Sequence, residues 1–226
     1  MDILPDFALA LDGLWLIERA STPDERDYGG LVDLQSYGDT WDGRWRMSLP
    51  DGQTQVGIAM LTGNGLFASR CSADHHAARG VSPGLSVYRA TGEGHLPALW
   101  THETTTGRVR ETESRGAEGR ERLAGRYTVD CVDEDGARYT LEQEIRERGR
   151  VYDIEWRRDG ALAYVGVGLR WFDRLVVGWL PHLSGETPKV DVLAYSLGGA
   201  ESSGRIAGSW SRLGTGAIGT EVIVPG

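Results

Sequence analysis

Two short stretches decide the fold of this chain: Trp41-Asp42-Gly43-Arg44-Trp45-Arg46 and Tyr152-Asp153-Ile154-Glu155-Trp156-Arg157. Each contains an aromatic residue, an acid and a tryptophan in the same order. In the second stretch, Tyr152, Ile154 and Trp156 alternate with charged residues. This period of two is typical of a β-strand with one buried face and one solvated face. Both stretches therefore predict amphipathic strands.

The two stretches belong to an internal repeat that runs through the whole chain. Matching residues keep their order, and their offset drifts only from 112 to 107 and back to 108 positions. The further matches are Gly13-Leu14-Trp15 with Gly125-Arg126-Tyr127, Tyr28 with Tyr139, Val56-Gly57-Ile58 with Val165-Gly166-Val167, Tyr88 with Tyr195, Trp100 with Trp210, and Thr112-Glu113 with Thr220-Glu221. The sequence predicts two tandem domains, residues 1–115 and 123–226, joined by a polar linker.

Turn residues divide the second repeat into about eight short segments of strand-like sequence. The segments are Arg126 to Val132, Tyr139 to Arg146, Val151 to Arg157, Ala161 to Arg170, Leu175 to Leu180, Lys189 to Ser196, Arg205 to Ser211 and Ala217 to Val224. Asp51-Gly52, Asp135-Gly136 and Asp159-Gly160 are hairpin signals, so neighbouring strands are expected to be antiparallel.

The short loops between these segments favour an up-and-down meander. About eight strands can close such a sheet and remove its exposed edges. We therefore expect an all-β fold of two tandem antiparallel barrels, one for each repeat. A single large barrel or sandwich shared by the two halves is the alternative. The apolar pattern from Ile3 to Leu11 predicts a short helix beside the first barrel.

The first strand of each repeat opens with Gly-x-Trp or Gly-x-Tyr, at Gly13-Leu14-Trp15 and Gly125-Arg126-Tyr127. Together with the glycine-turned meander of eight strands, this motif resembles the calycin group of lipocalin-like and avidin-like barrels. The resemblance implies a cup-like interior for a small, mostly apolar ligand. Lipocalins commonly carry export signals and disulfides, which this sequence does not show. No ligand-binding residue is carried over from the calycins.

Composition limits the partners that we expect. The 33 acidic residues outnumber the 24 basic ones, for a net charge of −9, which disfavours nucleic acid. No apolar run is long enough to span a bilayer, and the first residues lack a basic signal-peptide region. Cys71, in a polar loop, and Cys131, in a strand, are expected to be free thiols. We expect a soluble, cytoplasmic protein that binds no membrane.

The aromatic residues that recur in both repeats are the candidate ligand-binding residues. They are Trp15, Trp45, Tyr88, Trp100, Tyr127, Trp156, Tyr195 and Trp210. The structural interpretation places them in the barrel cores. The functional interpretation places some of them in a lumen, because aromatic side chains dominate apolar pockets.

Four ionisable residues are candidates for catalysis: Glu113, Glu221, His75 and His76. The two glutamates recur at matched places near strand ends, where each could serve as a general base or accept an arginine that closes the barrel, such as Arg126. The two histidines lie in a loop from Arg70 to Gly80 that is longer than its counterpart.

That same loop contains Cys71 and Asp74, which invites a metal interpretation. Adjacent histidines do not easily reach one ion, so a solvated loop, or a loop at a barrel mouth with one catalytic histidine, is favoured over zinc. No Gly-x-Ser-x-Gly nucleophile elbow is present to indicate a serine hydrolase. No P-loop or Gly-x-Gly-x-x-Gly motif is present either, and no cofactor is expected. Trp171 and Phe172 at a hairpin tip predict a hydrophobic lid or a contact between the repeats.

These observations favour a protein that binds a small hydrophobic or aromatic molecule in a barrel cavity. The first alternative is a cofactor-free cyclase or isomerase, in which the barrel folds a flexible substrate and a Glu or His moves one proton. The second alternative is a structural or interaction module with filled barrels. Exposed aromatic hairpin tips also lead us to expect that copies can self-associate.

Overall fold

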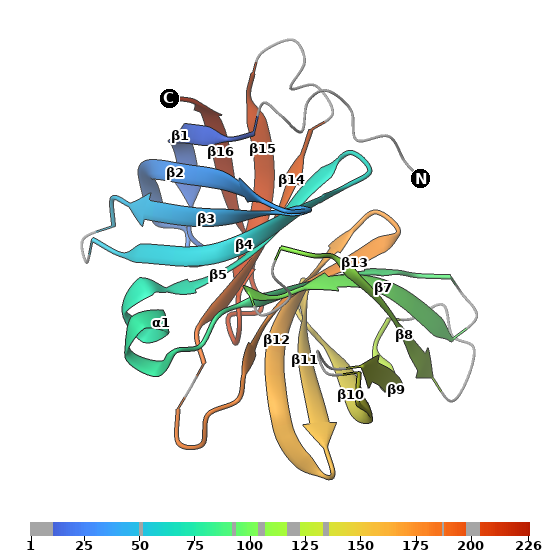
Figure 1. Ribbon diagram of the computed structural model, residues 1–226. Helices are drawn as coiled ribbons and strands as arrows, with labels where there is room; N and C mark the ends of the chain where they lie inside the picture. The colour runs from blue at the N-terminus through green and yellow to red at the C-terminus, as the bar shows by residue number, and fades with distance from the viewer. Residues whose placement is uncertain are drawn as a thin grey trace.

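The computed structural model describes residues 11–49, 52–91, 94–103, 107–116, 123–132, 136–186, 188–197 and 204–226. Its strands form two closed antiparallel barrels of eight strands each, which confirms the expected fold class and excludes one shared barrel (Figure 1). The N-terminal helix expected from Ile3 to Leu11 falls almost entirely outside the described residues.

Barrel I is built from two separate segments of the chain. In Figure 1 it combines the blue and cyan strands with the red ones. Its strands are β1 (Gly13–Ser21), β2 (Asp27–Tyr37), β3 (Thr40–Met47), β4 (Thr54–Thr62), β5 (Gly65–Ser72), β14 (Val190–Ser196), β15 (Ile206–Arg212) and β16 (Gly219–Pro225). The barrel closes where β1 pairs with β16 and β5 pairs with β14.

Barrel II is one continuous segment between β5 and β14. Its strands are β6 (Gly84–Arg89), β7 (His95–Thr101), β8 (Arg110–Gly116), β9 (Gly125–Val132), β10 (Arg138–Arg148), β11 (Val151–Arg158), β12 (Ala161–Trp171) and β13 (Arg174–Pro181). Each strand pairs with the next, and β13 closes the barrel on β6. The expected domains, residues 1–115 and 123–226, therefore do not correspond to the two barrels.

The repeat itself is visible in the strand order. Each strand of barrel I has a counterpart eight strands further along the chain, counting on from β16 to β1. Replacing every strand of barrel I by its counterpart gives the strand order of barrel II. The first five strands of each repeat stay together, whereas the last three join the barrel of the other repeat. Each barrel is thus completed by strands from both repeats, an exchange that sequence matching does not reveal.

The individual strands agree closely with the sequence predictions. All eight segments expected in the second repeat are strands, with ends shifted by at most two residues. At the hairpin between β11 and β12, Asp159 and Gly160 both have positive φ, at 51° and 79°, as a tight two-residue turn requires. The expected alternation is also present, since Tyr152, Ile154 and Trp156 are all buried.

The segments that differ most between the repeats connect the two barrels. Helix α1 (Ala73–Arg79) lies between β5 and β6, so the expected solvated loop is instead the end of a strand followed by one short helix. Glu186, in the connection from β13 to β14, makes an ion pair with Arg79 and lies 3.8 Å from His75. Within the described residues, no helix is long and apolar enough to cross a bilayer.

The barrels pack against each other through a shared apolar cluster from β4, β5 and β14 on one side and β6, β12 and β13 on the other. Trp171 at the β12–β13 hairpin packs edge-on against Phe67 of barrel I, with ring centroids 6.2 Å apart. This confirms the contact between the repeats, whereas Phe172 is 76% exposed.

Cys71 lies on β5 and is buried in the interface between the barrels, not in a polar loop as expected. Both cysteines are free thiols, as expected.

One end of each barrel is closed in the same way. The Trp15 indole donates a hydrogen bond to the carbonyl oxygen of Leu11 at 2.9 Å, and the Tyr127 hydroxyl donates one to that of Leu123 at 3.0 Å. Leu11 and Leu123 are both buried. The recurring Gly-x-aromatic motif therefore anchors the chain that enters each first strand.

Candidate functional site

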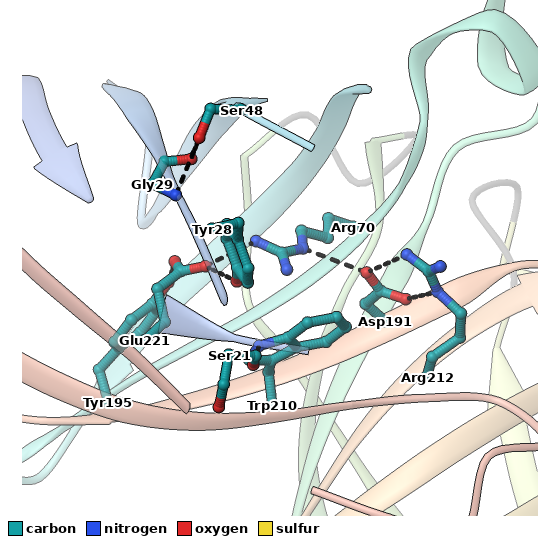
Figure 2. Close-up of polar contacts among 10 residues, drawn as sticks. All are labelled: Ser21, Tyr28, Gly29, Ser48, Arg70, Asp191, Tyr195, Trp210, Arg212 and Glu221. Atoms are coloured by element: carbon teal, nitrogen blue, oxygen red, sulfur yellow. Dashed lines mark hydrogen bonds and ion pairs between the residues drawn. The ribbon is translucent and has the colours of Figure 1, made fainter. Parts of the chain in front are cut away.

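The lumen of barrel I is filled by a buried polar network (Figure 2). Glu221 on β16 accepts hydrogen bonds from the hydroxyls of Tyr28, at 2.5 Å, and Tyr195. Arg70 on β5 donates to the same carboxylate at 3.2 Å. Arg70 and Glu221 are each at most 1% exposed, so this ion pair is fully removed from water.

Asp191 extends the network along the barrel. It accepts a hydrogen bond from Arg70 at 3.3 Å and two from Arg212, at 2.7 and 3.1 Å. The Arg70 guanidinium also lies against the Trp210 ring, 4.9 Å from its centroid, and against Trp45 at 5.5 Å. Two arginines thus balance two carboxylates, and indole rings fill the space around them.

Electrostatics favour a charged Arg70 and neutral tyrosines in this network. Burial opposes the charge on Arg70, but Glu221 and then Tyr28 and Asp191 outweigh it and keep the pKa of Arg70 above its ordinary value. Burial, followed by the charge of Glu221, raises the pKa values of Tyr28 and Tyr195, so both hydroxyls remain neutral donors. Together with the surrounding indole rings, these polar side chains fill the lumen of barrel I, where a ligand would otherwise lie.

Barrel II encloses a cavity of about 290 Å³ instead. Most of its wall is aromatic or aliphatic. The cavity is lined by Ser86, Tyr88, Trp100, His102, Arg110, Thr112, Val129, Cys131, Val132, Tyr139, Leu141, Trp156, Tyr164, Trp179 and Pro181. A mostly apolar concave wall with a few polar groups is characteristic of small-molecule sites.

Trp179 on β13 organises one wall of the cavity. Its ring is stacked on His102, with centroids 5.2 Å apart and planes at 10°. It makes edge contacts with Tyr164 and Trp156 at 5.2 and 6.5 Å, and its indole N–H donates to the Ser86 hydroxyl at 3.0 Å. These contacts fix the indole and present a rigid aromatic surface to the lumen.

Gly84 makes room for this indole. It pairs with Trp179 across β6 and β13, and a Cβ at this position would lie 2.1 Å from the Trp179 ring. The equivalent pair in barrel I is Asp191 with Arg70. The same two places thus hold an ion pair in one barrel and an aromatic ring over glycine in the other.

The cavity has a closed end and an open end. On the closed side, the Gln143 amide donates to the Tyr88 hydroxyl at 2.9 Å, and Leu123 and Tyr127 cover the end of the barrel. At the other end, the lining includes Val132, which is 46% exposed, and Arg110 at the start of β8. A ligand can therefore enter from the end where β8 begins.

Burial keeps the Tyr88, Cys131 and Tyr139 side chains of the wall neutral under ordinary conditions. Burial raises the pKa of the Cys131 thiol to about 11 and that of Tyr88 to about 12, and it also raises the pKa of Tyr139. The described lining contains no carboxylate. Across the described residues, no three His, Cys, Asp or Glu side chains gather in a way that could hold a metal ion.

The eight aromatic candidates separate into three groups. Tyr88, Trp100 and Trp156 line the cavity of barrel II. Trp45, Tyr195 and Trp210 instead belong to the packed interior of barrel I, whereas Trp15 and Tyr127 anchor the barrel ends.

The structure does not bring the four catalytic candidates together. Glu221 is buried in barrel I, whereas Glu113 is 40% exposed outside barrel II. Hydrogen bonds from Arg115 and then His95 lower the pKa of Glu113 below its usual range. His75 and His76 lie on α1, which connects the barrels, and neither lines the barrel II cavity.

Both the expected counterpart and the expected partner of Glu221 were wrong. Thr112, not Glu113, is the structural equivalent of Glu221, because Thr112 pairs with Ala98 as Glu221 pairs with Gly208. A slip of one residue in a strand exchanges its two faces, which explains why Glu113 points outward. The partner of Glu221 is also not Arg126, which is 86% exposed and lies 3.8 Å from Glu144.

Sequence reasoning missed several residues of the cavity wall. They are Tyr139, Tyr164, Trp179, His102 and Arg110. Tyr139 was already matched with Tyr28 in the repeat, and this match could have revealed it. Trp179 has Arg70 as its counterpart, so matching of like residues passed over the position that differs most.

Comparisons with protein-family models, with curated proteins and with solved structures each found no match for this chain. The functional argument therefore depends on the geometry of the two lumens.

Proposed function

We propose that the chain binds a small aromatic or hydrophobic molecule in the lumen of barrel II. The observation that carries this proposal is the contrast between the barrels. Barrel I holds a buried network of charged and tyrosine side chains, whereas the equivalent space in barrel II is a cavity of about 290 Å³ with aromatic walls. An apolar cavity of this kind offers a ligand both burial and stacking surfaces.

Binding is favoured over catalysis by the chemistry of the described wall. A general base should have a pKa close to the working pH. The Cys131 thiol and the Tyr88 hydroxyl have pKa values raised to about 11 and 12, and the described lining holds no carboxylate. His102 is stacked on Trp179, and its Nε2 lies 3.0 Å from the carbonyl oxygen of Ser82.

The calycin resemblance is part of this proposal. The strand order of barrel II, a continuous meander of eight strands closed by its first and last strands, supports that relationship. The arrangement that Trp15 and Tyr127 share at the two barrel ends supports it as well. Within this scheme, barrel I serves as the scaffold and barrel II as the binding module.

A fluorescent probe tests the proposal. N-phenyl-1-naphthylamine is an uncharged aromatic compound that becomes bright in apolar surroundings. We expect saturable binding at one site per chain. Thr112→Trp places an indole into the lumen and should weaken binding by at least about tenfold, the free-energy equivalent of about 1.4 kcal/mol.

Thr140→Trp is the matched control, because Thr140 is exposed on the outer face of β10. It should leave the dissociation constant within about twofold of the original value. Equal binding by the original chain and Thr112→Trp, with both folded, would show that the probe does not enter the lumen and would overturn the proposal.

A further inference from the structure

Two arginines lie at the open end of barrel II. Arg110, at the start of β8, lines the cavity, and its guanidinium lies 5.8 Å from the centroid of the Trp100 ring. Arg158, at the end of β11, lies 4.3 Å from the centroid of Tyr139, another residue of the wall. Both guanidinium groups therefore extend the aromatic wall to the mouth.

Neither arginine has a carboxylate partner within ion-pair distance among the described residues. What sets these two arginines apart is that each guanidinium lies over an aromatic ring of the cavity wall. Outside the mouth, the neighbouring Arg146, Arg148 and Arg157 of the same barrel all pair with acids. Among the described residues, the contacts of the two cationic side chains at the mouth are thus with aromatic rings and not with carboxylates.

A contact with an aromatic ring leaves the hydrogen-bonding capacity of each guanidinium unused. A guanidinium that lies on a ring uses its face, whereas its N–H donors point outward along its edges. Those donors match the oxygen atoms of a carboxylate, sulfonate or phosphate. At the mouth of an apolar cavity, such a contact is only partly screened by water.

We infer that the ligand of barrel II has an aromatic or apolar body that enters the lumen and an anionic group that stays at the mouth, held by Arg110 and Arg158. This inference rests on the proposed function, because it assigns the ligand class of the same cavity. It adds a charge requirement that the aromatic wall alone does not impose.

Two related probes separate the charge from the body. 1-Anilinonaphthalene-8-sulfonate is N-phenyl-1-naphthylamine with one added sulfonate. We expect the double variant Arg110→Gln with Arg158→Gln to lose at least about tenfold in affinity for the sulfonate probe. The affinity for the uncharged probe should fall far less than that for the sulfonate probe, because the aromatic wall remains, so the ratio of the two affinities changes. Binding of the uncharged probe also shows that the lumen is intact.

Arg126→Gln is the control for loss of one positive charge, because Arg126 is 86% exposed on β9, at the closed end of barrel II. It should leave both affinities unchanged. An unchanged ratio of the two affinities in the double variant would overturn the charge inference while leaving lumen binding intact. Failure of Thr112→Trp to reduce binding of the uncharged probe would instead overturn the proposed function.

Discussion

Thr112 and Glu221 occupy the same register position in the two barrels. Thr112 lies opposite Ala98 on β7, and Glu221 lies opposite Gly208 on β15. The Thr112 hydroxyl donates to the backbone oxygen of Asp130 at 3.1 Å and leaves space in the lumen. The Glu221 carboxylate instead reaches across its lumen to an arginine and two tyrosines.

Removing Glu221 should destabilise the fold strongly. Glu221→Leu leaves the buried charge of Arg70 without one of its two partners, and breaking a buried pair in this way costs about 3 to 5 kcal/mol. Urea unfolding followed by tryptophan fluorescence measures this loss. Glu113→Gln, on the outer face of barrel II, is the control and should unfold like the original chain. Equal stability of the two variants would contradict the assigned roles.

The barrel I network can be transplanted into barrel II. Tyr88 and Tyr139 are the counterparts of the two tyrosines that donate to Glu221. We therefore expect Thr112→Glu and Trp179→Arg to destabilise the protein singly, by about 3 kcal/mol or more, because each buries an unpaired charge. The double variant should recover at least about 1 kcal/mol of the summed loss.

A double-mutant cycle of unfolding free energies measures that recovery. The double variant should also bind the uncharged naphthylamine probe at least about tenfold more weakly, since the new pair fills the lumen. Additive losses in the cycle would show that the two positions do not meet.

The cysteines should react slowly with iodoacetamide in the folded protein. Burial raises the pKa of Cys131 to about 11, against 9.0 for an ordinary thiol, so its thiolate fraction near pH 8 is about 100-fold lower. Alkylation followed by mass spectrometry should accelerate about tenfold for each pH unit up to about 11. Saturation with the naphthylamine probe should slow Cys131, which lines the cavity, and leave Cys71 unchanged. Reaction of Cys131 at the rate of the unfolded chain would contradict this result.

Alkaline pH should weaken barrel I through its tyrosines. The pKa values of Tyr28 and Tyr195 are raised in the folded state, first by burial and then by the charge of Glu221. The stability that the two hydroxyls contribute is therefore fully present below pH 10, the ordinary tyrosine pKa. It is lost as the pH rises through the folded-state pKa. We expect the unfolding free energy to begin to fall at about pH 10 and to keep falling as the pH rises further. Tyr28→Phe with Tyr195→Phe should show a smaller fall; an equal fall would assign the effect to other groups.

The two histidines of α1 should have no role in ligand binding. His76 Nδ1 contacts the Val81 carbonyl oxygen at 3.0 Å, and His75 faces Glu186 at 3.8 Å, both outside the cavity. His75→Ala and His76→Ala should therefore bind the naphthylamine probe within about twofold of the original chain. Fluorescence titration of each variant with the naphthylamine probe measures this. A tenfold weaker affinity for the probe in either variant would place α1 at the binding site.

Much of the fold could be predicted because its signals are local. Alternation in the segment around Trp156 and the Asp159-Gly160 turn are properties of a few neighbouring residues, and they define strands and hairpins correctly. Which strands close each barrel is not local. The edge of β5 pairs with β14 although β6 is nearer in the sequence, and the repeat makes the corresponding strands similar.

The site was predicted only in part for a related reason. Matching like residues identifies positions that point inward, such as Trp45 and Trp156, but it does not show which lumen is full. That depends on positions where the repeats differ, such as Arg70 against Trp179, whose equivalence is given by strand register.

The exchange of three strands between the repeats makes neither half of the chain autonomous. A polypeptide ending at β8 holds five strands of one barrel and three of the other, and the same is true of the remainder that begins at β9. Each fragment on its own would present open sheet edges, which invite aggregation. A duplication with this connectivity resembles the fusion of two strand-exchanged subunits more than the joining of two subunits that each fold alone. After a chain break between the repeats, both barrels can form only if the two fragments associate again.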